Sequence, residues 1–119
     1  MVRRIVVKFG GALITKKDKQ SVARIEIIRD LCSVVHSLTT DGVQVIIVHG
    51  AGSFGHLKAK LWRLNEGYIP NLSHPNDSCE SQVEAVHEVR QDMLRLNSIV
   101  VAELENLGLV VHSHPPHRW

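Results

Sequence analysis

The chain has 119 residues, of which 44% are hydrophobic and 22% charged, and its formal net charge is +2 with neutral histidines. This length allows one domain with its own core, and there is no basic stripe with interleaved aromatic residues to predict nucleic-acid binding. No apolar run approaches the ~20 residues of a membrane span, and Lys8 interrupts the first run too early for a signal peptide. Cys32 and Cys79 lack metal-ligand spacing, which favours reduced thiols in a cytoplasmic protein. We therefore expect neither nucleic acid nor a membrane as a partner.

Residues 4–8 are predicted to form a buried strand, because a continuous β-branched apolar run suits a sheet covered on both faces. The strand leads into Gly10 and Gly11, where missing side chains let backbone N–H groups converge on an anion. Lys8 at the strand end can neutralise a phosphoryl group held by that turn, and a solvated lysine is the alternative. The turn is not a P-loop, because the GxxxxGK[ST] pattern is absent.

A polar loop over residues 10–20 carries Lys16, Lys17 and Lys19. Most charge runs are merely solvated, yet phosphoryl transfer depends on cations around the transferring group, so a second lysine near Lys8 would suit it. Spacing alone does not choose among the three.

The next elements predict a parallel βαβ unit. From residue 21 to 38 the apolar positions recur at intervals of three and four, which predicts an amphipathic helix with Ser21 as its cap. Asp41 and Gly42 end that helix, and residues 43–48 are predicted to form a second buried strand. A strand, a helix and a strand connected in this way give a right-handed parallel crossover.

A second glycine-rich turn spans residues 49–56 and ends in His56, at the predicted start of a helix where a bound anion would lie. Imidazole can donate a hydrogen bond to an acceptor phosphate; the alternative is an ordinary surface histidine. For His49, which directly follows the strand, we favour a structural role as a buried, hydrogen-bonded side chain that shapes the turn. Two such turns in one small chain suggest a crevice for two phosphate-bearing ligands.

The remaining chain is predicted to contain a short helix over 54–64, a loop or lid over 65–78, a long helix over 80–106 and a third strand over 109–111. Apolar residues on the long helix are predicted to be core, although they could also line a pocket for a substrate tail; these are Val86, Val89 and Met93. Three histidines near the end lack a carboxylate or cysteine at ligand spacing, so we expect loop residues and no metal site; they are His112, His114 and His117.

Two motifs resemble a known family. Residues 8–18 read KFGGALITKKD and residues 49–56 read HGAGSFGH, which together resemble the isopentenyl phosphate kinases of the amino acid kinase superfamily. The resemblance implies an α/β fold, a parallel-sheet α/β sandwich of amino acid kinase type that is incomplete. Residues 1–119 would be its N-terminal, acceptor-phosphate-binding part, and the C-terminal nucleotide-binding part would be absent.

The resemblance also implies an activity: transfer of the γ-phosphoryl group of ATP, with Mg²⁺, to isopentenyl phosphate, in the alternative mevalonate route of isoprenoid biosynthesis. Lys17 and His56 would be catalytic, and a cytoplasmic homodimer would be expected. The implied ATP-binding residues are Lys8, Gly10, Gly11, Ala12 and Ala51, and the implied substrate-binding residues are Gly50, Gly55 and His56. The family commonly has serine where this chain has Ala12, which removes a hydroxyl contact and keeps the backbone amide.

Two other hypotheses remain open at this point. The chain could be a truncated, catalytically inactive module that binds phosphate compounds or associates with a full-length kinase through its long helix. It could also be an amino acid kinase relative with another phosphate or phosphonate acceptor.

Overall fold

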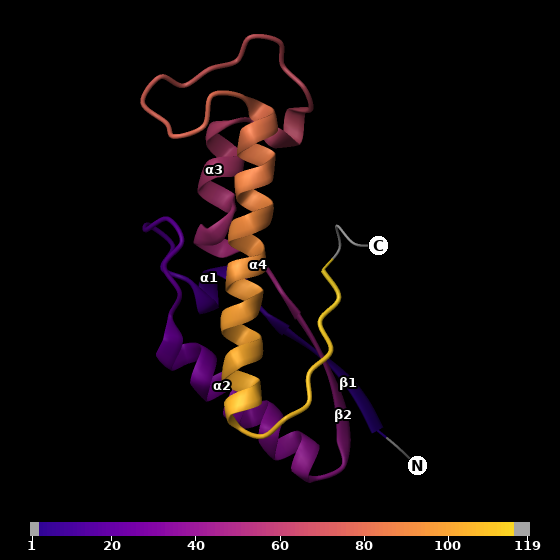
Figure 1. Cartoon of the computed structure of the whole chain (residues 1–119). Coiled ribbons are helices and arrows are strands. Elements are labelled where there is room, and N and C mark those ends of the chain that lie inside the picture. Colours follow the sequence, from indigo (N-terminus) through magenta and orange to yellow (C-terminus); the bar gives the residue numbers. More distant parts are fainter. Residues whose placement is uncertain (1–2, 116–119) are drawn as a thin grey trace.

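The computed structural model describes residues 3–115, and its elements form one layer of helices against a small sheet (Figure 1). The strands are β1 (Arg3–Phe9) and β2 (Val43–His49). The α-helices are α1 (Gly11–Ile14), α2 (Ile25–Thr40), α3 (His56–Leu61) and α4 (Gln82–Asn106), and the 3₁₀ turns are η1 (Gly52–Phe54) and η2 (Leu64–Glu66). No helix among these residues is long and apolar enough to cross a membrane.

The two strands pair in parallel, with Arg3 opposite Val43 at one end and Phe9 opposite His49 at the other. Helix α2 connects them, so the predicted βαβ unit is confirmed. Because both strands end at the same level of the sheet, the segments that follow them start side by side.

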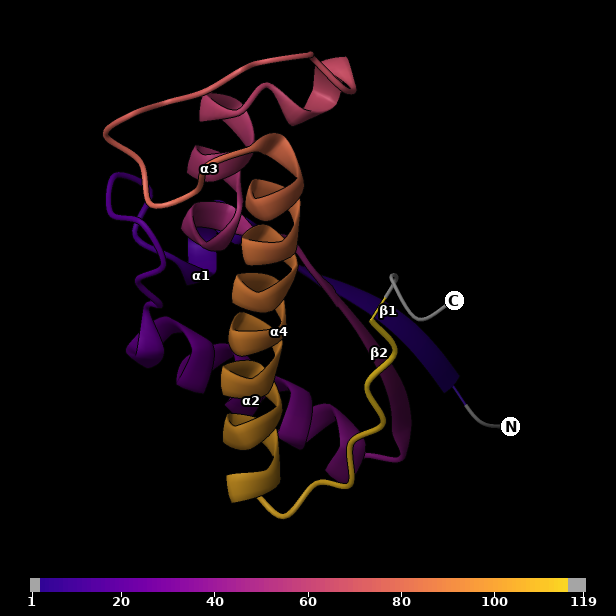
Figure 2. The same cartoon turned by 45° about the horizontal axis from the view of Figure 1, so that its top comes forward.

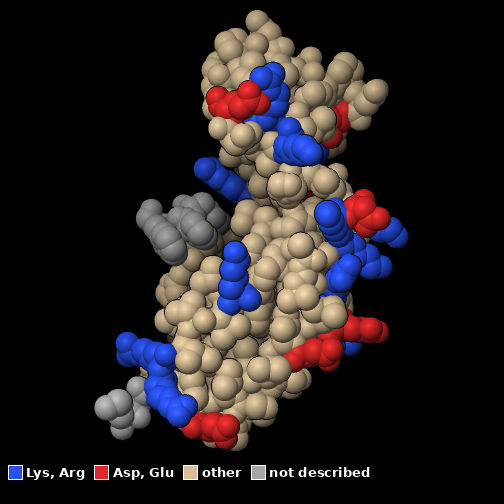
Figure 3. All heavy atoms as spheres, turned by 180° about the vertical axis from the view of Figure 1, so that it is seen from behind, with Lys and Arg blue, Asp and Glu red and all other residues tan. Residues whose placement is uncertain are grey.

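Only one face of this sheet is covered in the described part of the chain. Side chains on that face, such as Val7, Val45 and Ile47, pack on the main core. On the opposite face Val6 is 68% exposed, Ile46 54% and Val48 51%. The prediction of strands covered on both faces is therefore wrong for residues 3–115, since the helices lie on one side only. Figure 3 shows the molecule from behind, with a broad surface that few charged side chains interrupt.

Helix α2 begins at Ile25 and not at the predicted Ser21. Its cap residue is Arg24, which makes no side-chain capping bond, and Ile28 and Cys32 are fully buried. The segment before the helix instead pairs with the end of the first turn, through an antiparallel bridge between Thr15 and Ala23. That pairing keeps the backbone extended, which delays the helix by one turn.

Helix α4 is the longest helix among the described residues, and its start follows the capping rules. The Ser81 hydroxyl accepts from the Glu84 amide at 3.3 Å, and the Glu84 carboxylate accepts from the Glu80 amide at 2.7 Å. The helix packs on both hydrophobic clusters of the fold: Leu96, Val100 and Leu104 in the main core, and Ala85 beside Trp62 and Cys79 in the smaller one.

The predicted third strand over 109–111 is not formed. Leu109 and Val111 pack on the core and Val110 is 87% exposed, so the side chains alternate as they would in a strand. Within residues 3–115, however, the sheet consists of β1 and β2, and this segment pairs with neither. Alternation alone does not make a strand, because the backbone needs a hydrogen-bonding neighbour.

Candidate functional site

The two glycine-rich turns pack directly against each other at the end of the sheet. The Gly50 amide donates to the Phe9 carbonyl at 3.2 Å, continuing the pairing of the strands. A Cβ on Gly11 would clash with the backbone of Gly52, and a Cβ on Gly52 would clash with the Gly11 carbonyl. Gly52 also has φ +51°, which favours glycine. Glycine is required here because two backbones meet.

Thr15, which the sequence motifs did not single out as functional, joins the two turns. Its side chain is fully buried, and its hydroxyl donates to the Gly11 carbonyl at 2.7 Å. The same oxygen accepts from the Ser53 amide at 3.0 Å. A hydroxyl can donate and accept at once, so one side chain satisfies a backbone group in each turn.

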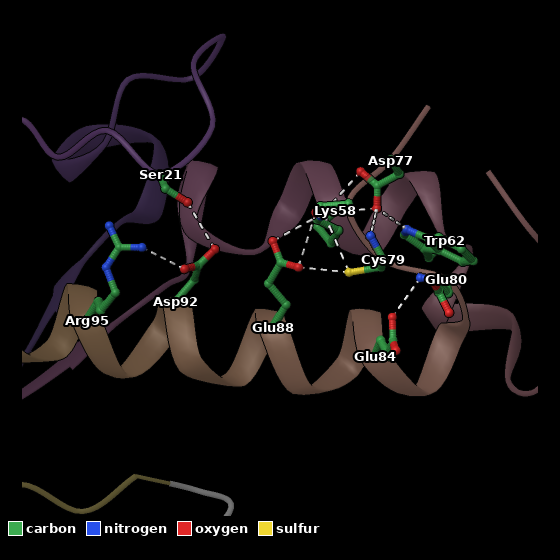
Figure 4. Close-up of polar contacts among 11 residues, drawn as sticks. Ser21, Lys58, Trp62, Asp77, Cys79, Glu80, Glu84, Glu88, Asp92 and Arg95 are labelled. Atoms are coloured by element: carbon green, nitrogen blue, oxygen red, sulfur yellow. Dashed lines mark hydrogen bonds and ion pairs between the residues drawn. The ribbon is translucent and has the colours of Figure 1, made fainter. Parts of the chain in front are cut away.

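The lysine-rich loop is tied to the second turn and to α4. The Ser21 amide donates to the Ser53 carbonyl at 2.9 Å, and the Ser21 hydroxyl donates to Asp92 of α4 at 3.1 Å (Figure 4). Ser21 therefore holds the base of the loop with φ +57° instead of capping α2. In Figures 1 and 2 the loop lies beside the start of α3. Three exposed lysines follow the first turn in this loop: Lys16, Lys17 and Lys19.

The predicted ATP-binding residues lie along the first turn and the facing part of the second. Lys8 and Ala12 are exposed. A Cβ added at Gly10 would meet no atom within 4 Å, so the space beside this backbone is open. Gly11 and Ala51 are partly buried where the turns touch. The backbone at Gly10 is therefore accessible two residues after the exposed Lys8, and accessible backbone N–H groups of this kind can bind an anion.

The predicted substrate-binding residues lie on the second turn. His56 is the exposed first residue of α3, and Gly50 is partly buried. Gly55 is buried, and a Cβ there would lie 3.1 Å from Val89 and 3.7 Å from Met93 of α4. The half-buried Val89 and Met93 of α4 therefore pack behind the turn that carries His56.

His49 has the structural setting that the sequence predicted, although it is half-buried. Its Nδ1 lies 3.0 Å from the Gly50 carbonyl, and its Nε2 lies 3.1 Å from Oδ1 of Asn97 on α4. Asn97 in turn donates to Ser113 at 2.6 Å. The imidazole thus links the second turn to α4 and to the segment after it.

A buried ionic cluster lies at the other end of α3, and sequence reasoning missed it (Figure 4). Lys58 is 5% exposed, and its Nζ lies 3.0 Å from Asp77 and 3.3 Å from Glu88. Asp77 also accepts from Trp62 Nε1 at 2.9 Å, and Glu88 accepts from the Cys79 thiol at 2.8 Å. The available signal was the i, i+4 spacing of Lys58 and Trp62, which places Lys58 of α3 on the same side as the C-cap residue Trp62.

The charges of this cluster are mutually stabilised. Burial disfavours an ionised Asp77, but hydrogen bonds from Trp62, Lys58 and the Cys79 amide outweigh it and lower the Asp77 pKa to about 2. Burial also opposes the Lys58 charge, and hydrogen bonds to Asp77 and Glu88 outweigh it, so the Lys58 pKa is raised. Burial and the bond to Glu88 raise the Cys79 pKa to about 11. The cluster therefore uses these fixed charges to hold the loop before α4, which contains Asp77 and Cys79, against α3 and α4.

Within residues 3–115, no metal-ligand group lies at the two turns, and a groove on the surface lies away from the predicted site residues. Among residues 3–115 no group of three or more His, Cys, Asp or Glu side chains could hold a metal ion. His112 and His114 belong to no such group, and His117 lies outside the described residues. A groove of about 360 Å³ runs between α4 and the segment after it, but no predicted site residue lines it. Its lining residues are Leu94, Asn97, Ser98, Val101, Glu105, Ser113 and Pro115.

Comparison with known proteins assigns this arrangement to a family. The model of the amino acid kinase family matches residues 3–118, so the chain belongs to the amino acid kinase family. It is 30% identical over 105 residues to the isopentenyl phosphate kinase of Thermoplasma acidophilum, which covers 88% of this chain and 38% of that protein.

Solved structures of isopentenyl phosphate kinases are also similar to this chain. The crystal structure of the T. acidophilum isopentenyl phosphate kinase product complex matches with a TM-score of 0.68 at 29% identity, over 90% of this chain and 40% of that one. A second match, described as X-ray structures of isopentenyl phosphate kinase, has a TM-score of 0.76 at 26% identity, over 98% of this chain and 46% of that one. These matches confirm the predicted α/β fold of amino acid kinase type. The chain spans less than half the length of these relatives.

Proposed function

We propose that this chain carries the acceptor-phosphate half of an isopentenyl phosphate kinase, which transfers the γ-phosphoryl group of ATP to isopentenyl phosphate. The observation that carries the proposal is the backbone contact between two glycine-rich turns at one end of a parallel sheet. Two anion-binding backbones in contact would hold a phosphoryl donor and a phosphate acceptor close to each other. Similarity to the isopentenyl phosphate kinases supports this choice of substrate.

In this proposal the first turn binds ATP. Backbone amides of Gly10, Gly11 and Ala12 face its phosphates, Lys8 neutralises their charge, and Ala51 contacts the same nucleotide from the second turn. Ala12 keeps the amide that this requires. Mg²⁺ would accompany the ATP phosphates; because the described residues provide no carboxylate cluster, none of them is assigned to the ion.

The second turn would bind isopentenyl phosphate. Gly50 and Gly55 contact the substrate, and His56 donates a hydrogen bond to its phosphate. Lys17 stabilises the charge on the transferring group, since catalysis of phosphoryl transfer relies on positioning and on cations around the equatorial oxygens. The tether from Ser21 to Ser53 and Asp92 supports this assignment, because it joins the lysine loop to the acceptor turn.

A pair of variants tests the proposal in the isolated chain. Gly10→Ala adds a methyl group where no atom lies within 4 Å, at φ −60° and ψ 137°, so the fold is expected to be unchanged. The methyl group would occupy the space proposed for ATP phosphates, and ATP affinity in calorimetry should fall at least about tenfold, or about 1.4 kcal/mol. His56→Ala should weaken isopentenyl phosphate by a similar factor and leave ATP binding unchanged.

Turnover is measured with ATP, Mg²⁺ and isopentenyl phosphate, for the chain alone and joined to the C-terminal half of a related kinase. Formation of isopentenyl diphosphate that depends on Lys17 and His56 is the expected result in the joined protein. Wild-type protein that binds neither ligand, or a joined enzyme whose activity is unchanged by His56→Ala, would contradict the proposal.

The second candidate is a phosphate-binding or regulatory module without turnover. The chain spans 38–46% of the length of the relatives that it matches. Binding of isopentenyl phosphate without product, together with co-elution with a full-length kinase in size-exclusion chromatography, would support this candidate. A substrate panel separates isopentenyl phosphate from other phosphate and phosphonate acceptors, which addresses the third hypothesis.

We propose a metabolic role and a location for the protein as well. The product, isopentenyl diphosphate, would enter isoprenoid biosynthesis through an alternative mevalonate route, as the resemblance to the family implies. We further propose a homodimer in the cytoplasm, where the two free cysteines, Cys32 and Cys79, would stay reduced. Sedimentation velocity over a range of concentrations measures the oligomeric state.

A further inference from the structure

We infer that Thr15 is a positioning residue that sets the spacing of the two phosphate-binding turns. The inference rests on the proposed function. Thr15 is not among the catalytic, ATP-binding or substrate-binding residues that the resemblance implies. Thr15 does not face the open space beside Gly10; it is 0% exposed and acts through the backbone on either side of it.

The contacts of Thr15 are specific to a hydroxyl group. Its oxygen donates to the Gly11 carbonyl in the first turn and accepts from the Ser53 amide in the second. The Ser53 amide would lose its hydrogen bond without this hydroxyl, because the hydroxyl is its acceptor. The Gly11 carbonyl would keep a bond, because it also accepts from the Thr15 amide at 3.1 Å. Removing the hydroxyl would leave a buried N–H without a partner, an outcome that folded proteins avoid.

The second turn is packed tightly against the Thr15 hydroxyl. A Cβ at Gly52 would collide with the Thr15 oxygen as well as with Gly11, so the second turn fits against the hydroxyl only as glycine. Without the hydroxyl, η1 must shift to find another acceptor for the Ser53 amide. His56 follows η1 by two residues, and a shift of η1 moves its helix start relative to the first turn.

Thr15 also connects to the lysine loop. Its backbone pairs with Ala23 across the base of that loop, and Ser53 bonds to Ser21 and Val22 from the other side. One hydroxyl therefore lies where the donor turn, the acceptor turn and the loop that carries Lys17 come together. Geometry of this kind controls phosphoryl transfer, because small misplacements of reacting groups cost large factors in rate.

The experiment compares Thr15→Val, which keeps the shape and removes the hydroxyl, with Thr15→Ser, which keeps the hydroxyl. Thr39→Val is the matched control: the Thr39 hydroxyl also bonds a carbonyl, that of His36, but far along α2 from the turns. Circular dichroism sets a temperature at which all variants are folded, so that loss of stability does not enter the binding constants.

The first measurement needs no ligand. Amide hydrogen exchange by NMR should show the Ser53 N–H exchanging at least about tenfold faster in Thr15→Val, since its acceptor is gone, and near the wild-type rate in Thr15→Ser and Thr39→Val. Unchanged exchange at Ser53 in Thr15→Val would overturn the inference whatever the ligands do.

The second measurement is the affinity for isopentenyl phosphate by calorimetry. Thr15→Val is expected to bind about tenfold more weakly, the factor that a lost buried hydrogen bond of about 1.4 kcal/mol produces, and Thr15→Ser within about threefold of wild type. Wild-type binding with an equal affinity in Thr15→Val overturns the role of Thr15 and leaves the proposed function standing. Wild-type protein that binds no ligand overturns both.

Discussion

At the scale of single residues, Lys58 is a buried cation whose charge has two carboxylate partners. Removing one partner from a buried ion pair leaves an uncompensated charge, which typically costs about 3–5 kcal/mol. Lys58→Met should therefore lower the free energy of unfolding by about 3 kcal/mol. Urea denaturation followed by tryptophan fluorescence measures it, since Trp62 is fully buried beside the cluster.

The control lies close by in the chain. Glu66 pairs with Arg63 at 2.6 Å, but both side chains are about half exposed. Glu66→Gln should change stability little, because water screens such pairs. An equal loss in both variants would show that burial does not govern the Lys58 cluster.

The low Asp77 pKa also predicts a pH dependence. Asp77 has a pKa of about 2 in the fold and about 3.8 when unfolded, so the unfolded state binds more protons between these values. The stability that Asp77 contributes is fully present above about pH 4 and is lost as the pH falls through about 2. Asp77→Asn should flatten the unfolding free energy over this interval, and a variant profile parallel to wild type would contradict the assignment.

Gly52 is a position where any side chain is expected to destabilise the fold. Its φ of +51° and its contacts with Gly11 and Thr15 exclude a side chain. Gly52→Ala should cost at least about 2 kcal/mol, because left-handed backbone strain and a clash add together. Thermal unfolding measures the loss, and Gly10→Ala is the control, since its methyl group meets open space. Equal melting temperatures for wild type and Gly52→Ala would mean that the turns do not touch.

At the scale of elements, the Ser81 side chain caps the start of α4. The Ser81 hydroxyl accepts from the Glu84 amide, and loss of such a cap costs about 1 kcal/mol. Ser81→Ala should lower stability by this amount and speed amide exchange in the first turn of α4. Ser98→Ala is the matched control: the Ser98 hydroxyl bonds to the Leu94 carbonyl within the same helix, and alanine is the better helix former there. A larger loss in Ser98→Ala than in Ser81→Ala would contradict this.

The sequence predicted the elements with a strong local signal and missed those that depend on distant partners. The two strands follow from their continuous β-branched apolar runs, α2 and α4 from the spacing of their apolar residues, and the glycine turns from their composition. Ser21 satisfies the rules for a cap, but Ser53 and Asp92 bind it instead, and both are far away in the chain. Residues 109–111 have strand-like alternation without a neighbouring strand.

The candidate site likewise contains residues that the local sequence predicts and residues that depend on distant partners. The residue types at the two turns are local in sequence, and the parallel crossover predicts that the turns meet. The sequence analysis identified neither Thr15 nor Lys58, and the spacing of Lys58 to Trp62 was too weak a signal, because the importance of both residues comes from partners that only the fold brings together. A threonine after a glycine turn and a lysine in a short helix are common, and each is exceptional only by its burial.

At the scale of the whole molecule, the open face of the sheet dominates. Val6, Ile46 and Val48 are more than half exposed on adjacent parallel strands, and such a surface promotes association. Ile46→Lys should reduce binding of a hydrophobic dye and any concentration-dependent self-association, with no loss of circular dichroism signal.

The control for this surface lies on another element. Val83 is 71% exposed on α4, away from the sheet, so Val83→Lys should leave dye binding nearly unchanged. If both variants reduced dye binding equally, the sheet would not be the surface responsible.

The ionic cluster around Lys58 makes Cys79 a natural reporter of motion in the loop that it closes. A buried thiol with a pKa of about 11 is nearly inert to alkylating reagents at neutral pH. It would become reactive only when the loop detaches from α3 and α4. Cys32 is buried in α2, and its pKa is also raised to about 11. It would react only after the main core unfolds. Two alkylation rates, read by mass spectrometry without any introduced label, would thus separate local opening from global unfolding.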